Sequence, residues 1–160
     1  MTEHSRTWRG SLPRVAVQVE VISDVTGEVV EAFGRLLPQL SRIAPPLDRA
    51  ALENIVSSPA ITLLAARSAG VINGSLTLVM FPLPTGLRAW IEDVVVDESA
   101  RGQGVGGALT MAAVQQAIAA GARTVDLTSR PSREAAGRLY ERSGFKLRDS
   151  RVYRYVPGAG

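Results

Sequence analysis

A glycine-rich segment that follows an apolar strand is the part of this sequence best suited to chemistry. The strand ends in three valines at positions 94–96, and residues 102–107 then contain four glycines. Glycines let the backbone approach a ligand closely, and the free amides and dipole of a helix N-terminus attract phosphate. No charged side chain occurs from Gly102 through Ala122. We therefore expect a phosphate-binding loop here, although the upstream carboxylates of Asp97 and Glu98 oppose it.

Two other phosphate-binding motifs fit this segment less well. Gly102, Gly104 and Gly107 satisfy the dinucleotide pattern G-x-G-x-x-G, and Asp126 lies at a suitable distance downstream. However, residues 97–101 separate the strand from the first glycine, whereas a dinucleotide-binding turn begins almost at the strand end. Too few strands follow for a doubly wound sheet. A P-loop is excluded because no Lys-Ser or Lys-Thr pair follows the glycines.

Composition excludes several kinds of site. The 160 residues include no cysteine and one histidine, His4, so a cysteine nucleophile, a histidine triad and a metal site are not expected. The net charge is +3, but the arginines are spread along the chain, which does not favour nucleic-acid binding. No apolar run is long enough to cross a membrane, and the polar N-terminus does not resemble a signal peptide. A cytoplasmic location is the expectation.

The elements that must position the loop can be read from periodicity and breakers. Strands are predicted at residues 15–22, 61–67, 71–81, 87–96, 124–128 and 151–156. Helices are predicted from a cap at Asp24 to a stop at Pro38, from Asp48 to about Val56, from the glycine-rich segment to about Ala120, and from a cap at Ser132 to Gly144. The run of three valines suggests a strand buried on both faces. This order predicts one α/β (α+β) domain with a mixed sheet at residues 15–156, between tails at 1–14 and 157–160.

Two motifs together resemble the GNAT superfamily of acetyl-CoA-dependent N-acetyltransferases. The first is Arg101-Gly102-Gln103-Gly104-Val105-Gly106, which is similar to the family signature of Arg or Gln, two residues, Gly, one residue, and Gly or Ala. The second is the helix end Leu139-Tyr140-Glu141-Arg142-Ser143-Gly144-Phe145. The resemblance covers residues 60–156 well, and the N-terminal third only in the order of its elements.

The resemblance implies a central mixed sheet that is splayed beside the valine run, and a binding site for acetyl-CoA as co-substrate. It implies that the amides of residues 102–107 hold the CoA pyrophosphate and that the valine backbone pairs with the pantetheine arm like an added strand. Many members carry an Asn near the start of the second motif's helix, where this chain has Arg133. The expected cofactor-binding residues are Val94, Val95, Val96, Arg101, Gly102, Gln103, Gly104, Val105, Gly106, Gly107 and Arg133.

Catalysis is expected to proceed by direct attack of an amine on the thioester in a ternary complex, because there is no cysteine to carry the acyl group. By match to the family's tyrosine, Tyr140 is the candidate general acid for the departing thiolate. Glu92 is the candidate base, with Asp93 behind it. A two-residue period would place Glu92 on one strand face with Val94 and Val96, and a carboxylate beside buried valines has a raised pKa.

The amine acceptor is open at this stage. The resemblance implies an acceptor cleft at residues 36–54 and 82–86, and this region has a mixed set of polar side chains: Gln39, Ser41, Arg42, Asp48 and Arg49. A small molecule is favoured over a protein amine, because the chain has no acidic groove for a basic peptide. The alternatives are a non-catalytic acyl-CoA-binding or regulatory module and a nucleotide-binding protein. A strand near the C-terminus could pair two copies into a homodimer.

Overall fold

A computed structural model describes residues 16–158 of the chain. The chain divides into two compact units, the first ending at Leu127 and the second beginning at Thr128, and each is described by itself. The predicted N-terminal tail lies outside the described residues, as do the last two residues of the predicted C-terminal tail.

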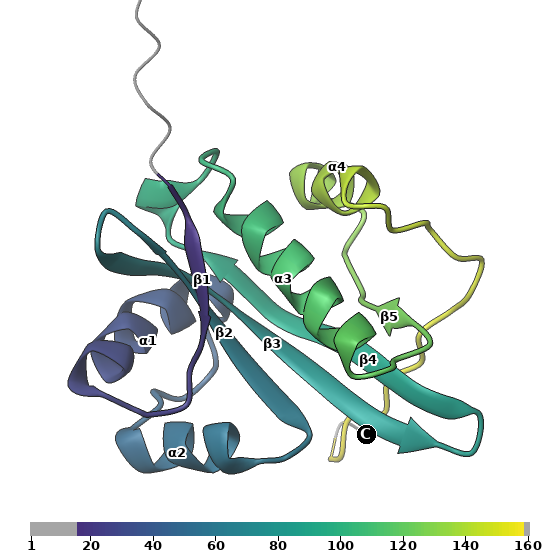
Figure 1. Ribbon diagram of the computed structural model, residues 1–160, viewed down its shortest axis with the longest axis horizontal. Coiled ribbons are helices and arrows are strands. Elements are labelled where there is room, and N and C mark those ends of the chain that lie inside the picture. The colour runs from purple at the N-terminus through teal and green to yellow at the C-terminus, as the bar shows by residue number, and fades with distance from the viewer. Residues whose placement is uncertain (1–15, 159–160) are drawn as a thin grey trace, which may run out of the picture. The chain divides into compact units, whose positions relative to one another are not determined.

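The first unit is built on a five-stranded mixed sheet (Figure 1). Its strands are β1 (Gln18–Val21), β2 (Ile61–Ser68), β3 (Val71–Leu83), β4 (Gly86–Val96) and β5 (Val125–Asp126), in that spatial order. The first four strands are antiparallel to their neighbours, and β5 is parallel to β4. The strands predicted at residues 61–67 and 71–81 are confirmed and form a hairpin: Ala69 and Gly70 both have positive φ between β2 and β3, as a two-residue turn between twisted strands requires.

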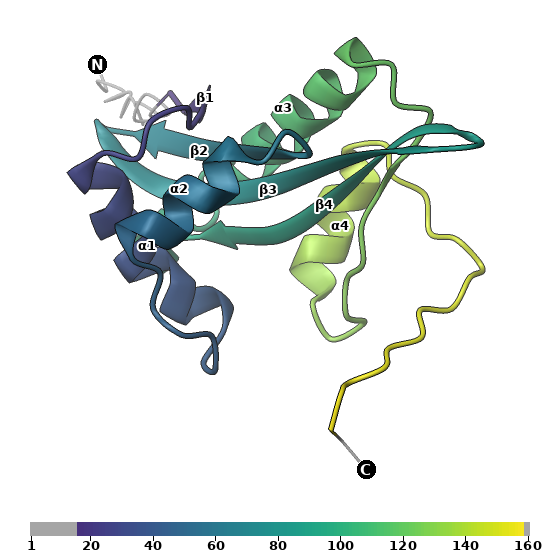
Figure 2. The ribbon, with the colours of Figure 1, turned by 90° about the horizontal axis from the view of Figure 1, so that it is seen from below.

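Helices cover both faces of this sheet. The helices are α1 (Gly27–Leu40), α2 (Arg49–Ser57) and α3 (Val105–Ala119), with a short 3-10 turn at Glu98–Ala100. Figure 2 shows α1 and α3 on opposite sides of the sheet. Leu63 and Ala65 of β2 pack with α1 and α2, whereas the buried Leu64 between them faces the other way, as strand alternation requires.

Close approach between α3 and the sheet depends on Gly74. A Cβ at Gly74 would lie 2.7 Å from Cγ1 of Val105 and 3.1 Å from Cδ1 of Leu109. The glycine on β3 therefore lets the first turns of α3, which is apolar and carries buried Leu109, Ala113 and Ala117, sit directly against the strands. The start of α3 is fixed in this way by packing on the sheet.

The start and end of α1 differ from the prediction. Thr26, not Asp24, is the N-cap, and its hydroxyl accepts a hydrogen bond from the Val29 amide at 3.3 Å. Pro38 lies inside the last turn and does not stop the helix. A proline removes one amide donor but keeps a helical φ, and the helix continues until Ser41 donates to the carbonyl of Leu37 at 2.9 Å. The Asp48 cap of α2 is confirmed by a 2.8 Å bond from the Ala51 amide.

The second unit contains α4 (Glu134–Arg142). The predicted Ser132 cap is wrong, because the N-cap is Arg133, which makes no side-chain capping bond. The predicted strand at residues 151–156 is also wrong: none of these residues is in a strand, and Val152, Tyr153 and Tyr155 are 69%, 87% and 87% exposed. Alternating side chains form a strand only where a neighbouring strand pairs with the backbone. The expected homodimer depended on pairing through this strand. Since residues 151–156 form no strand, self-association stays an untested expectation.

Within residues 16–158, none of the helices combines the length and apolar character that crossing a membrane requires.

Candidate active site

The glycine-rich segment forms a loop of unengaged amides at the start of α3. Gly104 is the N-cap with φ of +84°, and Gly102 has φ of +76°; both are left-handed conformations that favour glycine. A Cβ at Gly102, Gly104 or Gly107 would meet open space. Among residues 16–158, the amides of residues 102–107 make no hydrogen bond of good geometry to a backbone or side-chain acceptor. The loop therefore presents six backbone donors and the positive end of a helix dipole to an anion.

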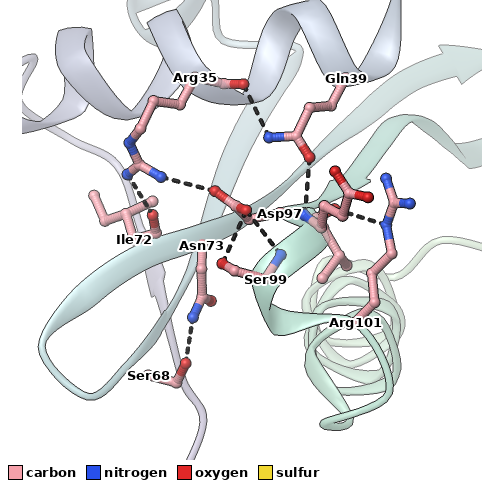
Figure 3. Close-up of polar contacts among 10 residues, drawn as sticks. Arg35, Gln39, Ser68, Ile72, Asn73, Asp97, Ser99 and Arg101 are labelled. Carbon is pink, nitrogen blue, oxygen red and sulfur yellow. Dashed lines mark hydrogen bonds and ion pairs between the residues drawn. The ribbon is translucent and has the colours of Figure 1, made fainter.

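The negative charge of Asp97 would oppose the binding of phosphate at the adjacent loop. Its carboxylate, however, is bound to other groups of the protein (Figure 3). One carboxylate oxygen lies 2.8 Å from Nη1 of Arg35 in α1, and the other accepts bonds from the amide and hydroxyl of Ser99 at 3.1 and 2.9 Å. The Ser99 bonds and the Arg35 charge hold the pKa of Asp97 below its usual range. The negative charge is thus compensated by a neighbouring cation and two donors.

Further bonds from α1 hold the segment between β4 and α3. Arg35 also donates to the carbonyl of Ile72 at 3.0 Å. The side-chain oxygen of Gln39 accepts the Glu98 amide at 2.9 Å, while its nitrogen donates to the carbonyl of Arg35 at 3.1 Å (Figure 3). The loop is positioned by α1, which is about 60 residues earlier in the chain.

The side chains of Arg101, Gln103 and Val105 make contacts within the protein, whereas the backbone amides of the loop do not. Arg101 is exposed, and its Nε donates to the carbonyl of Val96 at 3.4 Å. Gln103 is exposed and donates to the carbonyl of Ser99 at 3.3 Å. The side chain of Val105 is 1% exposed and packs towards β3. Val105 can therefore contribute only its backbone amide to a ligand.

A β-bulge interrupts β4 just before the valine run. Glu92 is opposite Thr77 and Val95 is opposite Ser75, so β4 advances three residues while β3 advances two. Asp93, within the bulge, has φ of +49°, which is uncommon for a residue other than glycine. The extra residue changes which side chains share a face. Glu92 therefore lies on the face of Val95, and the prediction that it shares a face with Val94 and Val96 is wrong.

The outer edge of β4 is free over the valine run. β5 pairs with β4 only at Ala89 and Trp90, and no strand among residues 16–158 pairs with that edge beyond Trp90. The sheet is therefore open at this position, as the splayed arrangement predicts. The valine run is not buried on both faces as predicted, because Val95 is the one buried residue of the three valines.

Glu92 has an exposed side chain whose carboxylate accepts a 2.8 Å bond from Nε1 of Trp90, two residues earlier on the same strand. Although Glu92 shares a face with Val95, its side chain is not buried among the valines as expected. The indole instead fixes the orientation of one carboxylate oxygen and leaves the other accessible.

Tyr140 and Arg133 lie in the second unit, at the two ends of α4. The helix ends in a Schellman motif: the Phe145 amide donates to the Tyr140 carbonyl and the Gly144 amide to the Glu141 carbonyl, both at 3.0 Å. Gly144 has φ of +92°, the left-handed conformation that this motif requires, and the predicted helix stop at Gly144 is confirmed. The Tyr140 and Phe145 rings meet edge to face, with centroids 6.0 Å apart. Burial raises the pKa of Tyr140, and the charge of Arg133 acts in the opposite direction.

The structure thus brings together the loop, the valine run and Glu92 within the first unit. Sequence reasoning missed Arg35 and assigned Gln39 to the acceptor cleft, whereas Gln39 binds the segment before the loop, because nothing in a helix sequence shows which loop its polar face will meet. It placed Asp93 second to Glu92, since the bulge that exposes Asp93 has no signal in the valine pattern.

Comparison with known proteins agrees with this architecture. An acetyltransferase from Trypanosoma brucei is 28% identical, with 88% of this chain and 100% of that chain covered and a TM-score of 0.70. Glucosamine-6-phosphate N-acetyltransferase from Arabidopsis thaliana (18% identical; 88% and 98% covered; TM-score 0.72) and the aminoglycoside N-acetyltransferase AAC(6')-Iy in complex with CoA (17%; 92% and 99%; 0.74) share the fold.

No curated protein sequence matches the chain. The acetyltransferase (GNAT) family matches residues 29–145, which is well over half of the sequence and includes both motifs. The chain therefore belongs to the GNAT acetyltransferase family.

Proposed function

We propose that this protein transfers the acetyl group of acetyl-CoA to a primary amine, by direct attack in a ternary complex. The observation that carries the proposal is the run of six unengaged amides at residues 102–107, at the N-terminus of a helix. A cradle of this kind fits a pyrophosphate. The family to which the chain belongs uses acyl-CoA, and one structural relative was solved with CoA.

The free edge of β4 supports the same assignment. Pantetheine contains two amide groups, and the backbone of Val94, Val95 and Val96 would hydrogen-bond them as an added strand does. Arg101 and Gln103 lie exposed beside the loop, where they can contact the nucleotide part of CoA. Arg133, at the N-cap of α4, takes the place of the asparagine found in many relatives and would supply a charged contact.

The reaction needs a neutral amine, a carbonyl carbon to attack and a proton for the leaving group. Glu92 would accept the proton of the amine, directly or through water, with the carboxylate held by Trp90. The amine nitrogen then bonds to the thioester carbon as the carbon–sulfur bond breaks. Tyr140 would donate its phenolic proton to the departing thiolate, and the raised pKa keeps that proton in place at neutral pH.

A small-molecule acceptor is favoured over a protein amine. Structural relatives include enzymes named for aminoglycosides and for glucosamine 6-phosphate. The region between α1 and α2 also offers no acidic groove, since its charged side chains are of mixed sign.

Titration calorimetry with acetyl-CoA tests the cradle. We expect micromolar binding by the wild-type protein and a loss of about 100-fold in Gly104→Glu, which places bulk and a negative charge beside the phosphates. Gly70→Glu is the matched control, because Gly70 also has positive φ and open space at its Cβ but lies in the β2–β3 turn. Equal losses in both variants, or no binding by the folded wild type, would overturn the proposal.

Turnover and ligand choice separate the alternatives. The rate of thiol release from acetyl-CoA should be higher with primary amines from a panel than without any amine. Acetyl-CoA binding with no release on any amine would indicate a non-catalytic acyl-CoA-binding module. Binding of NAD or ATP in preference to CoA would indicate a nucleotide-binding protein instead.

A further inference from the structure

A small cavity lies between the sheet and the two helices α1 and α2. Its volume is about 60 Å³, enough for several water-sized groups, since one water needs about 10–15 Å³ on a comparable measure. Eight lining residues are apolar and three are polar. They are Phe33, Leu37, Leu40, Leu47, Leu52, Ile55, Leu63 and Val95, with Ser75, Thr77 and Asp93.

The polar part of the lining is concentrated at the β4 bulge. The Ser75 hydroxyl is already bonded to the carbonyl of Leu64 at 3.0 Å. Asp93 is the one charged residue of the lining, and its positive φ turns it out of the regular strand alternation. Among residues 16–158, its carboxylate accepts no hydrogen bond and forms no ion pair. An ammonium group would complement this charge.

The polar side chains of the α1–α2 segment do not line the cavity, because most of them hold the backbone. Gln39 binds the carbonyl of Arg35 and the amide of Glu98. The Ser41 hydroxyl accepts the Ala44 amide at 3.2 Å, Asp48 caps α2, and Arg49 donates to the carbonyl of Val25. A ligand in the cavity would therefore meet Leu37, Leu40 and Leu47 from this segment.

We infer that the acceptor is a primary amine on a compact apolar group, with its ammonium on Asp93 and its hydrocarbon part in the cavity between α1, α2 and the sheet. This inference rests on the proposed function. An alkyl chain gains free energy for each methylene that leaves water. The hydroxyl groups of a sugar amine would lose their hydrogen bonds to water in this cavity, and the leucine side chains offer none in return. Acetylation of the amine removes its positive charge, so the neutral product would lose the attraction of Asp93 and dissociate.

A series of amines tests the preference. With acetyl-CoA at saturation, we expect kcat/KM for thiol release to rise about fourfold per methylene from ethylamine upward until the cavity is filled. Glucosamine and glucosamine 6-phosphate should be at least tenfold poorer than the best alkylamine. If kcat/KM does not rise with the length of the alkyl chain, or if either sugar amine is preferred, the inference is overturned and the acetyl-transfer proposal still stands.

Two variants locate the amine. Asp93→Asn should raise KM for the best alkylamine about tenfold or more without changing the Kd of acetyl-CoA. Glu31→Gln, which removes the same charge from an exposed position on α1, should leave KM unchanged. Thr77→Leu fills the cavity and should abolish the gain from longer chains, whereas Thr77→Val, which keeps the size of the side chain, should not.

A measurement without acetyl-CoA keeps the two proposals separate. In methyl NMR, hexylamine should shift the resonances of Leu37, Leu47 and Val95, which line the cavity. No shift would overturn the cavity assignment, even if acetyl-CoA binds. Shifts in a protein that does not bind acetyl-CoA would support the cavity as an amine site and overturn acetyl transfer.

Discussion

The guanidinium of Arg35 lies 2.8 Å from the carboxylate of Asp97, and this ion pair joins α1 to the segment that leads into the glycine-rich loop. The Asp97 side chain is 14% exposed and the Arg35 side chain 43%. An ion pair with one well-solvated partner contributes little by itself. The ion pair matters because of where it lies, since the Asp97 carboxylate also accepts hydrogen bonds from the amide and the hydroxyl of Ser99.

Asp97→Asn should lower the free energy of unfolding by about 1–2 kcal/mol at pH 7, because bonds to a charged acceptor are replaced by weaker ones. The folded-state pKa of Asp97 is lowered, so its stabilising contribution is present above the unfolded pKa near 4 and is lost as pH falls through the folded value. Urea denaturation of both proteins from pH 7 to pH 3 measures this. A difference that persists unchanged at the lowest pH would contradict it.

Gly74→Ala should destabilise the protein by about 1–3 kcal/mol, because the new methyl would overlap Val105 and Leu109. The same displacement should weaken acetyl-CoA binding severalfold, since it moves the first turn of α3. Gly34→Ala in α1 is the control: its Cβ would meet nothing within 4 Å, and helix propensity predicts a gain of up to about 1 kcal/mol. Thermal denaturation and calorimetry give both quantities.

Glu92→Gln should lower kcat about 10²- to 10⁴-fold near neutral pH, as expected for loss of a general base. The Kd of acetyl-CoA should not change. Trp90→Phe removes the indole donor that orients Glu92 and should give a smaller loss of kcat. A Glu92→Gln enzyme with the wild-type kcat would show that Glu92 is not the base.

Tyr140→Phe should lower kcat by a similar factor and leave the Kd of acetyl-CoA unchanged, because only the proton donor is lost. The pKa of Tyr140 is raised, so the phenol should stay protonated at pH 9, and the wild-type rate should show no loss from its ionisation below that pH. A difference titration of the phenolate absorbance between the two proteins checks the pKa directly. A titration midpoint below pH 10 would contradict the raised pKa of Tyr140.

Gly144→Ala should destabilise α4 by about 1–2 kcal/mol, since φ of +92° strains any side chain. Gly144→Asn should cost less, because asparagine tolerates the left-handed conformation. Hydrogen exchange at the Gly144 and Phe145 amides, which make the two capping bonds, measures the effect within the second unit. Equal exchange in all three proteins would show that the cap contributes nothing.

The sequence by itself determined the features that depend on neighbouring residues. The glycine-rich start of α3, the hairpin at Ala69 and Gly70 and the helix stop at Gly144 follow from local φ and amide availability. The family also followed from the sequence, because its two motifs are contiguous stretches.

Tertiary structure decided the features that depend on contacts between segments far apart in the sequence. The β4 bulge depends on pairing with β3, and it changed the face of Glu92 and brought Asp93 to the cavity. Residues 151–156 alternate like a strand but have no strand partner among the described residues. The compensation of Asp97 by Arg35 depends on how α1 packs, because a charge on a helix surface carries no local record of its partner.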